Sequence, residues 1–234
     1  MNALPATLDE LFRRHRLWRG GRATQRAVAA LPSGFPSLDR RLPEGGWPSG
    51  ALTEILTAVE GGGELQLMLP ALASLSAAGR RIVWLAPPHL PFAPALVAAG
   101  IELRNVAIVR TPRRREVLWV AEQMLRARAC HALLLWCRDV RYAELRRLSV
   151  AADASHALVA LFRPQQTAQT PSPAALRLGL APTVDGLELR ILKCRGPRSE
   201  GPLRLRVDRP VHALDRSSPA TSRSRDPVAR LCPA

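Results

Sequence analysis

The residues of this chain that could do chemistry centre on a glycine loop, Gly61-Gly62-Gly63. An apolar run, 51–56, precedes the loop, and a second apolar segment, 65–75, follows it. A strand, a glycine loop and a helix in this order present the N–H groups of a helix N-terminus to a phosphate. The sequence therefore predicts the scaffold of a nucleotide-binding site.

The lysine that this kind of loop needs is missing. The phosphate-binding pattern G-x-x-x-x-G-K-[ST] has a lysine directly after its last glycine, but Glu64 follows Gly63. A carboxylate would repel a triphosphate at close range. We therefore interpret Gly61, Gly62, Gly63 and Glu64 as a degenerate phosphate loop, and we expect no nucleotide cofactor, no metal and no catalytic residue.

A longer motif leads into the loop. Residues 33–55 read S-G-x-x-S-L-D-x-x-L-x-x-G-G-x-P-x-G-x-x-x-E-I, which ends on Glu54 and Ile55. This motif resembles the entry to the RecA core without a gap. A RecA-like core without its phosphate lysine is similar to the ImuA family, accessory proteins of a bacterial damage-inducible translesion synthesis cassette. The neighbouring resemblance is to SulA, the RecA-fold inhibitor of cell division.

The resemblance implies two further catalytic groups, and neither stands in its expected place. Where RecA proteins carry an acidic group that activates water, residues 86–88 are Ala-Pro-Pro, which cannot accept a proton. Where an aspartate would hold magnesium through water, the chain has Trp136 and Cys137, and Asp139 follows two residues later. These losses together predict that the protein is not an ATPase.

The remaining apolar pattern predicts an α/β fold. Strands are expected at 51–56, 81–86, 106–110, 131–137 and 157–162, and helices at 64–78, 94–100, 112–129 and 142–154. Their alternation predicts a RecA-like core with a mainly parallel central sheet flanked by helices. In the helix at 142–154, Leu145, Leu148 and Val150 are expected to face inward. Residues 163–174 are expected to form a polar, mobile loop.

Three segments after this loop alternate apolar and charged side chains. Leu176, Leu178 and Leu180 alternate with Arg177, and similar patterns recur at 187–191 and 203–207. Alternation of this kind predicts half-exposed strands. We expect an antiparallel C-terminal extension with leucines inside and basic side chains outside.

The chain divides into three parts on composition. Residues 1–30 are expected to form an N-terminal helical arm and linker, 31–209 the RecA-like domain, and 210–234 a disordered tail rich in Ser, Pro and Arg. The arm places Phe12 and Trp18 on one helical face, with arginines on the other. It either packs on its own domain or docks on another subunit, and the sequence favours neither.

The charge of the chain is strongly basic. Formal net charge is +15, and Lys193 is the only lysine, so that 33 of the 34 basic residues are arginine. An excess of this size favours contact with nucleic acid or an acidic partner. Candidate contact residues for a partner or DNA are Phe12, Trp18, Arg113, Arg114, Arg115, Lys193 and Arg195.

Two groups among these candidates have specific alternatives. Arg113, Arg114 and Arg115 stand at a helix start, where cations oppose the helix macrodipole, so they are either a solvated basic turn or a binding site. Lys193 and Arg195 match, by resemblance, the paired lysines with which RecA reaches the nucleotide of a neighbouring protomer.

The cysteines and apolar runs indicate a cytoplasmic protein. Four cysteines occur without a C-x-x-C pattern, as expected of reduced thiols, and Cys130, His131 and Cys137 are interpreted as structural residues. Asp9 and Glu10 near the N-terminus argue against a secretory signal. No apolar run reaches the length of a membrane span, so no membrane contact is expected.

The resemblance implies a function and a set of partners. It indicates a non-catalytic accessory protein of translesion synthesis that docks an ImuB-like Y-family polymerase homologue and an alternative replicative-type DNA polymerase. RecA and DNA are further candidate partners. The alternatives are a SulA-like inhibitor of a tubulin-like division protein and an active RecA-type ATPase.

Overall fold

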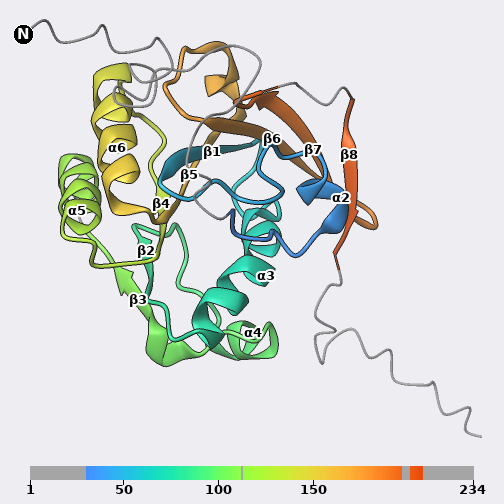
Figure 1. Ribbon diagram of the computed structural model, residues 1–234, viewed down its shortest axis with the longest axis horizontal. Coiled ribbons are helices and arrows are strands. Elements are labelled where there is room, and N and C mark those ends of the chain that lie inside the picture. Colours follow the sequence, from blue (N-terminus) through green and yellow to red (C-terminus); the bar gives the residue numbers. More distant parts are fainter. Residues whose placement is uncertain (1–29, 112, 197–200, 208–234) are drawn as a thin grey trace, which may run out of the picture.

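A single eight-stranded sheet organises the protein (Figure 1). The computed structural model describes residues 30–207 apart from 112 and 197–200, and the side chain of Arg114 is not described. The strands are β1 (Ala51–Thr57), β2 (Ile82–Leu85), β3 (Val106–Val109), β4 (Ala132–Trp136), β5 (Leu158–Pro164), β6 (Leu176–Thr183), β7 (Gly186–Lys193) and β8 (Leu203–Arg206). The helices are α2 (Pro36–Asp39), α3 (Glu64–Ala77), α4 (Ala93–Ala98), α5 (Arg114–Arg126) and α6 (Tyr142–Ser155), with short 3-10 turns η1 (Leu103–Asn105) and η2 (Gln165–Gln169).

The strand order confirms the predicted fold class. The order is β3-β2-β4-β5-β1-β6-β7-β8, and all pairs from β3 to β6 are parallel. β7 and β8 complete the sheet as antiparallel strands. The predicted antiparallel extension is confirmed for β6, β7 and β8, and β6 joins it to the core by pairing parallel with β1.

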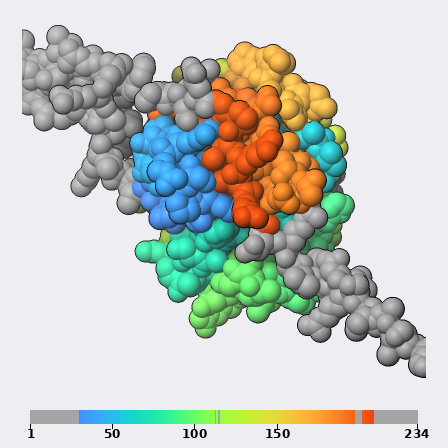
Figure 2. All heavy atoms as spheres, turned by 90° about the vertical axis from the view of Figure 1, so that its right-hand side faces the viewer, coloured from blue at the N-terminus to red at the C-terminus, as the bar shows by residue number. Residues whose placement is uncertain are grey.

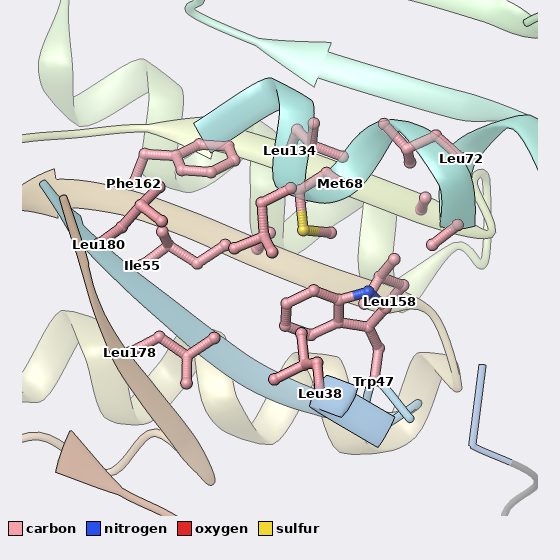
Figure 3. Close-up of a cluster of buried hydrophobic side chains, with 14 of the residues drawn as sticks. Leu38, Trp47, Ile55, Met68, Leu72, Leu134, Leu158, Phe162, Leu178 and Leu180 are labelled. Atoms are coloured by element: carbon pink, nitrogen blue, oxygen red, sulfur yellow. The ribbon is translucent and has the colours of Figure 1, made fainter. Parts of the chain in front are cut away.

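Helices cover both faces of the sheet. Side chains of α3 join those of α2 and α4 in one apolar core, and α5 and α6 pack into a second core on the opposite face. Figure 3 shows the first core, in which Trp47, Leu38 and Met68 meet the strand residues Ile55 and Leu178. The parallel strands are buried on both faces, which explains their continuous apolar runs.

The motif at residues 33–55, which leads into β1, contributes to the first core. Leu31 and Trp47 exchange backbone hydrogen bonds of 3.1 and 2.7 Å, and the indole of Trp47 is fully buried. Gly34 has φ +84°, and a Cβ there would collide with Pro70 in the middle of α3. Pro70 therefore lies inside a continuous helix and contacts the motif at a glycine.

The outer surface of this region shows how the two ends of the domain meet. Figure 2 shows the segment that contains α2 beside the strands near the C-terminus. α2 contacts β8, and Arg41 donates a 3.0 Å hydrogen bond to the carbonyl of Gly201. The start of the domain thus covers one end of the antiparallel extension.

Two local predictions were wrong. Val150 on α6 is 65% exposed, although Leu145 and Leu148 are buried as expected. The reason is that Val150 follows Leu148 by two residues, which turns it by about 200° around the helix axis to the opposite face.

The second wrong prediction concerns residues 163–174. They do not begin as a loop, because β5 continues to Pro164 and η2 follows directly.

Some predictions fall on residues that the structure does not describe. The arm at 1–30, with Phe12 and Trp18, lies outside the described residues except for Ala30, and so does the whole tail at 210–234. Within the described part of the chain, no helix is long and apolar enough to cross a membrane.

Candidate functional site

The glycine loop lies between the end of β1 and the start of α3, as predicted. Gly61 and Gly63 have φ of +77° and +99°, and Gly63 caps the N-terminus of α3. The N–H of Gly61 donates a 2.9 Å hydrogen bond to Oε1 of Glu64. The Glu64 side chain is buried at 5% exposure. A carboxylate of the chain itself thus accepts one of the N–H groups that would otherwise face an anion.

Side chains from the C-terminal extension crowd the same loop. A Cβ at Gly63 would collide with Leu187 at the start of β7, and a Cβ at Gly62 would lie 2.9 Å from the carbonyl oxygen of Val59 and 3.8 Å from Pro182. Leu187 is itself buried in the first core. The loop is therefore packed against β6 and β7 on one side and occupied by Glu64 on the other.

An aromatic residue, Trp136, stands at the end of β4, where an aspartate would hold magnesium. Trp136 at the end of β4 stacks on Phe162 of β5 at 4.6 Å between ring centroids, and Trp84 of β2 lies 6.0 Å from Trp136. Ala86 follows β2 with φ +52°. Asp139 lies in the connection after β4, outside the strand. The indole of Trp136 offers magnesium no ligand, and the methyl group of Ala86 cannot accept a proton.

An ion pair joins the glycine loop to the connection after β4. Arg138 Nη1 lies 3.3 Å from Glu60 Oε1, and both side chains are largely exposed. A pair of this kind contributes up to about 1 kcal/mol. It still identifies the edge of the sheet where these loops meet, because the carboxyl ends of parallel strands share one edge.

A second group of charged side chains is buried in the sheet itself. Glu54 in the middle of β1 is fully buried, and its Oε1 lies 2.9 Å from Arg163 Nη1 of β5. Its Oε2 lies 2.6 Å from Arg177 Nε of β6. Arg163 also donates a 3.3 Å hydrogen bond to the carbonyl of Val140. We call Glu54, Arg163 and Arg177 the buried ion cluster.

Arg177 extends this cluster to the segment after β5. Its Nη2 donates to the carbonyl of Thr167 at 2.8 Å, and its Nη1 donates to those of Ala168 and Thr170 at 3.3 and 3.1 Å. One guanidinium thus holds η2 and the residue that follows it against the sheet. The prediction that basic side chains of this strand point outward was wrong for Arg177, because Glu54 compensates its charge inside the sheet.

Lys193 also contacts the segment that follows β5. Its Nζ donates a 2.7 Å hydrogen bond to the carbonyl of Ser172. Burial lowers the pKa of Lys193, and the positive charges of Arg177 and Arg195 add to this effect while Glu54 opposes it. Lys193 ends β7, whereas Leu187 at its start contacts the glycine loop, so about 20 Å of strand separates the two. Within one chain, the structure does not bring Lys193 and Arg195 to that loop.

Sequence reasoning missed the role of the buried ion cluster. Glu54 was recognised only as a motif residue, and Arg163 only as the start of a loop. A signal was present, because Glu54 is the one acidic residue in the apolar run at 51–56, and such a run predicts a buried strand. A carboxylate in such a position needs cationic partners, and arginines in the neighbouring strands were the available candidates.

The hydrogen bonds from Arg177 to η2 and Thr170 lead to a testable prediction. Replacing Arg177 by lysine keeps a positive charge near Glu54. A single ammonium group, however, cannot replace the guanidinium that now donates to three carbonyls. We expect the protection of the backbone amides of residues 165–172 from hydrogen exchange to fall about tenfold. A change of this size corresponds to the free energy of one to two hydrogen bonds. Hydrogen exchange followed by mass spectrometry measures this. Arg204→Lys, at an exposed position of β8, is the control, and equal protection in both variants would contradict the assignment.

The three arginines at the start of α5 are only partly described. Arg113 and Arg115 are exposed, and Arg113 Nη1 lies 3.4 Å from Glu116 Oε1. Glu116 stands in the first turn of α5, where its charge favours the helix macrodipole. This acidic residue offsets the unfavourable placement of the arginines, so a binding role is not needed to explain them.

The cysteines near β4 lie in a buried, basic setting. Burial raises the pKa of the Cys130 thiol to about 11, which keeps the thiol protonated at neutral pH. Burial also lowers the pKa of His131, and the charges of Arg80 and Arg81 act in the same direction. Among the described residues, no group of three His, Cys, Asp or Glu side chains could hold a metal ion.

Comparison with known proteins places the chain among distant relatives of RecA and SulA. It is 26% identical over 135 residues to the RecA protein of Picosynechococcus, covering 58% of this chain and 38% of that protein. It is 26% identical over 134 residues to RecA 1 of Myxococcus xanthus, covering 57% of this chain and 39% of that protein. It is 30% identical over 100 residues to the cell division inhibitor SulA of Edwardsiella piscicida, covering 43% of this chain and 60% of that protein.

These matches are partial on both sides. The chain spans about two fifths of the length of the RecA proteins above, 38% and 39%. No protein-family model matches the chain. The relationship to RecA and SulA agrees with the α/β fold.

Proposed function

We propose that the protein is a non-catalytic accessory factor of damage-induced translesion DNA synthesis in the bacterial cytoplasm. It acts by docking other proteins: an ImuB-like Y-family polymerase homologue and an alternative replicative-type DNA polymerase. RecA and DNA are further candidate partners. The distant relationship to RecA and SulA supports a place in the DNA damage response.

The position of Glu64 is the main support for proposing that the protein does not hydrolyse ATP. Its buried carboxylate accepts the N–H of Gly61, where a phosphate oxygen would otherwise bind. Binding a triphosphate would require this carboxylate to leave and a negative charge to remain nearby without a lysine to offset it. The aromatic stack of Trp136 and Phe162 supports the same conclusion for the metal position.

This part of the proposal predicts the outcome of a nucleotide assay. The purified protein should bind no ATP in a titration with magnesium, and its phosphate release should equal that of a buffer blank. The matched variant is Gly63→Ala, which alters the loop at its most crowded position. ATP turnover that Gly63→Ala abolishes would contradict the proposal and restore an active RecA-type ATPase.

The docking part is tested by co-purification from DNA-damaged cells. The tagged protein should bring down a Y-family polymerase homologue together with a replicative-type polymerase. Binding of purified components then separates a direct contact from an indirect one. If neither polymerase binds directly, the accessory role is excluded whatever the nucleotide assay gives.

A cell-division inhibitor is the second candidate function. The identity of 30% to the inhibitor SulA over 100 residues favours it. In the same co-purification, a tubulin-like division protein in place of the polymerases would move the function to division control. That outcome would leave the fold and the degenerate glycine loop unchanged.

A further inference from the structure

The paired helices α5 and α6 carry large side chains that are at least half exposed among the described residues. The two helices contact each other on the face of the sheet opposite to α3 (Figure 1). Their outer side carries Trp119 at 60% exposure, Tyr142 at 50% and Val150 at 65%. Side chains of this kind are usually buried in a core or an interface. The exposed residues Arg115, Trp119, Tyr142, Arg146 and Val150 are called the α5–α6 surface below.

The spacing of these residues aligns them along the helices. Tyr142, Arg146 and Val150 are four residues apart on α6, which makes them neighbours along one side. Arg115 and Trp119 have the same spacing on α5. Each helix therefore presents arginine next to an exposed apolar or aromatic side chain, and the row on α6 is about 12 Å long.

The two rows are held at a fixed separation. Glu122 of α5 is buried between the helices, and its Oε1 accepts hydrogen bonds of 2.9 and 2.7 Å from Nε and Nη2 of Arg147 on α6. Arg126 lies 3.9 Å from the other oxygen of Glu122. The carboxylate of Glu122 thus pairs within the helix pair and is not exposed to solvent.

Among the described residues, the α5–α6 surface carries two positive charges, and Asp153, three residues beyond Val150 on α6, adds an exposed carboxylate at its end. No carboxylate pairs with Arg115 or Arg146 among the described residues. Glu144, two residues after Tyr142, accepts the backbone N–H of Arg141 at 2.8 Å and so caps α6. Further exposed arginines flank the surface at Arg126, Arg128 and Arg141.

From these observations we infer that the α5–α6 surface binds an acidic amphipathic helix of a partner protein. Exposed Trp, Tyr and Arg are the residue types that dominate protein interfaces. A partner helix with an apolar stripe would cover Trp119, Tyr142 and Val150, and acidic residues on its flanks would pair with Arg115 and Arg146. An aliphatic side chain such as Val150 gives a nucleobase no ring to stack on, which favours a protein over single-stranded nucleic acid. The inference rests on the proposed docking function and names the chemistry of one docked segment.

A synthetic helix tests the inference with the full chain. The probe is a fluorescent peptide of about 18 residues, five helical turns, with leucines on one face and glutamates beside them. Fluorescence anisotropy should show saturable binding that Trp119→Ala and Arg146→Glu each weaken about tenfold or more. A peptide with lysine in place of glutamate should regain binding to an Arg115→Glu, Arg146→Glu double variant.

Matched controls separate this surface from general basicity. Val184→Ala and Arg204→Glu change exposed residues elsewhere and should leave the affinity unchanged. Equal binding of a scrambled peptide of the same composition would overturn the inference. So would binding of a single-stranded oligonucleotide, rather than the peptide, that depends on Trp119 and Arg146. The assay uses no polymerase, so its failure leaves the proposed docking function to its own test.

Discussion

Replacing Glu54 by glutamine is expected to lower the free energy of unfolding by about 3–5 kcal/mol, the usual cost of removing one partner from a buried ion pair. The variant keeps the shape of the side chain but leaves the guanidinium groups of Arg163 and Arg177 buried with no negative charge beside them. Neither arginine can lose its proton to escape this cost. Equilibrium urea denaturation measures the change.

The control for this prediction is Glu188→Gln. Glu188 also lies between two arginines, but Arg190 and Arg204 are exposed and lie 3.4 and 3.7 Å away. Solvent screens such pairs, so this variant should change the stability by less than about 1 kcal/mol. Similar losses in the two variants would show that burial does not set the strength of the cluster.

The second large effect is expected at Trp47, and Trp119 provides its matched control. Trp47→Ala removes a fully buried indole from the first core and should cost about 3–5 kcal/mol. Trp119→Ala removes the same atoms from an exposed site and should change the stability by less than about 0.5 kcal/mol. Both values come from the same denaturation experiment.

This comparison also bears on the α5–α6 surface. If Trp119→Ala leaves stability unchanged but weakens peptide binding, the exposed indole is a binding residue and not part of the core. A large loss of stability in Trp119→Ala would mean that its ring packs on the protein, and the surface would then lose its central side chain.

The alternation of apolar runs and turns predicted most of the fold. The apolar run at 51–56 became β1, and the glycine loop and the helix after it lie where the pattern placed them. Such elements are predictable because the period of apolar residues and the backbone needs of glycine are local properties. The mainly parallel sheet followed from the alternation of strands and helices.

Side-chain direction was predicted less well when the partner was distant in sequence. Val150 was assigned inward, although its spacing from Leu148 places it on the outer side of α6. Arg177 was assigned outward because its neighbours alternate, yet it is buried. Alternation predicts which residues share a face of a strand, but not whether another segment covers that face.

The sequence by itself determined the order of the elements, the missing lysine and the presence of Glu64 after the glycines. Only the tertiary structure decided where the charged groups go. Glu54 meets Arg163 and Arg177 across 109 and 123 residues of chain, because the crossover connections place β5 and β6 on either side of β1. The glycine loop in which Glu64 accepts the N–H of Gly61 is covered by Leu187, from the other half of the domain. A charge inside a protein is stabilised by the partners that surround it, and these are known only once the chain is folded.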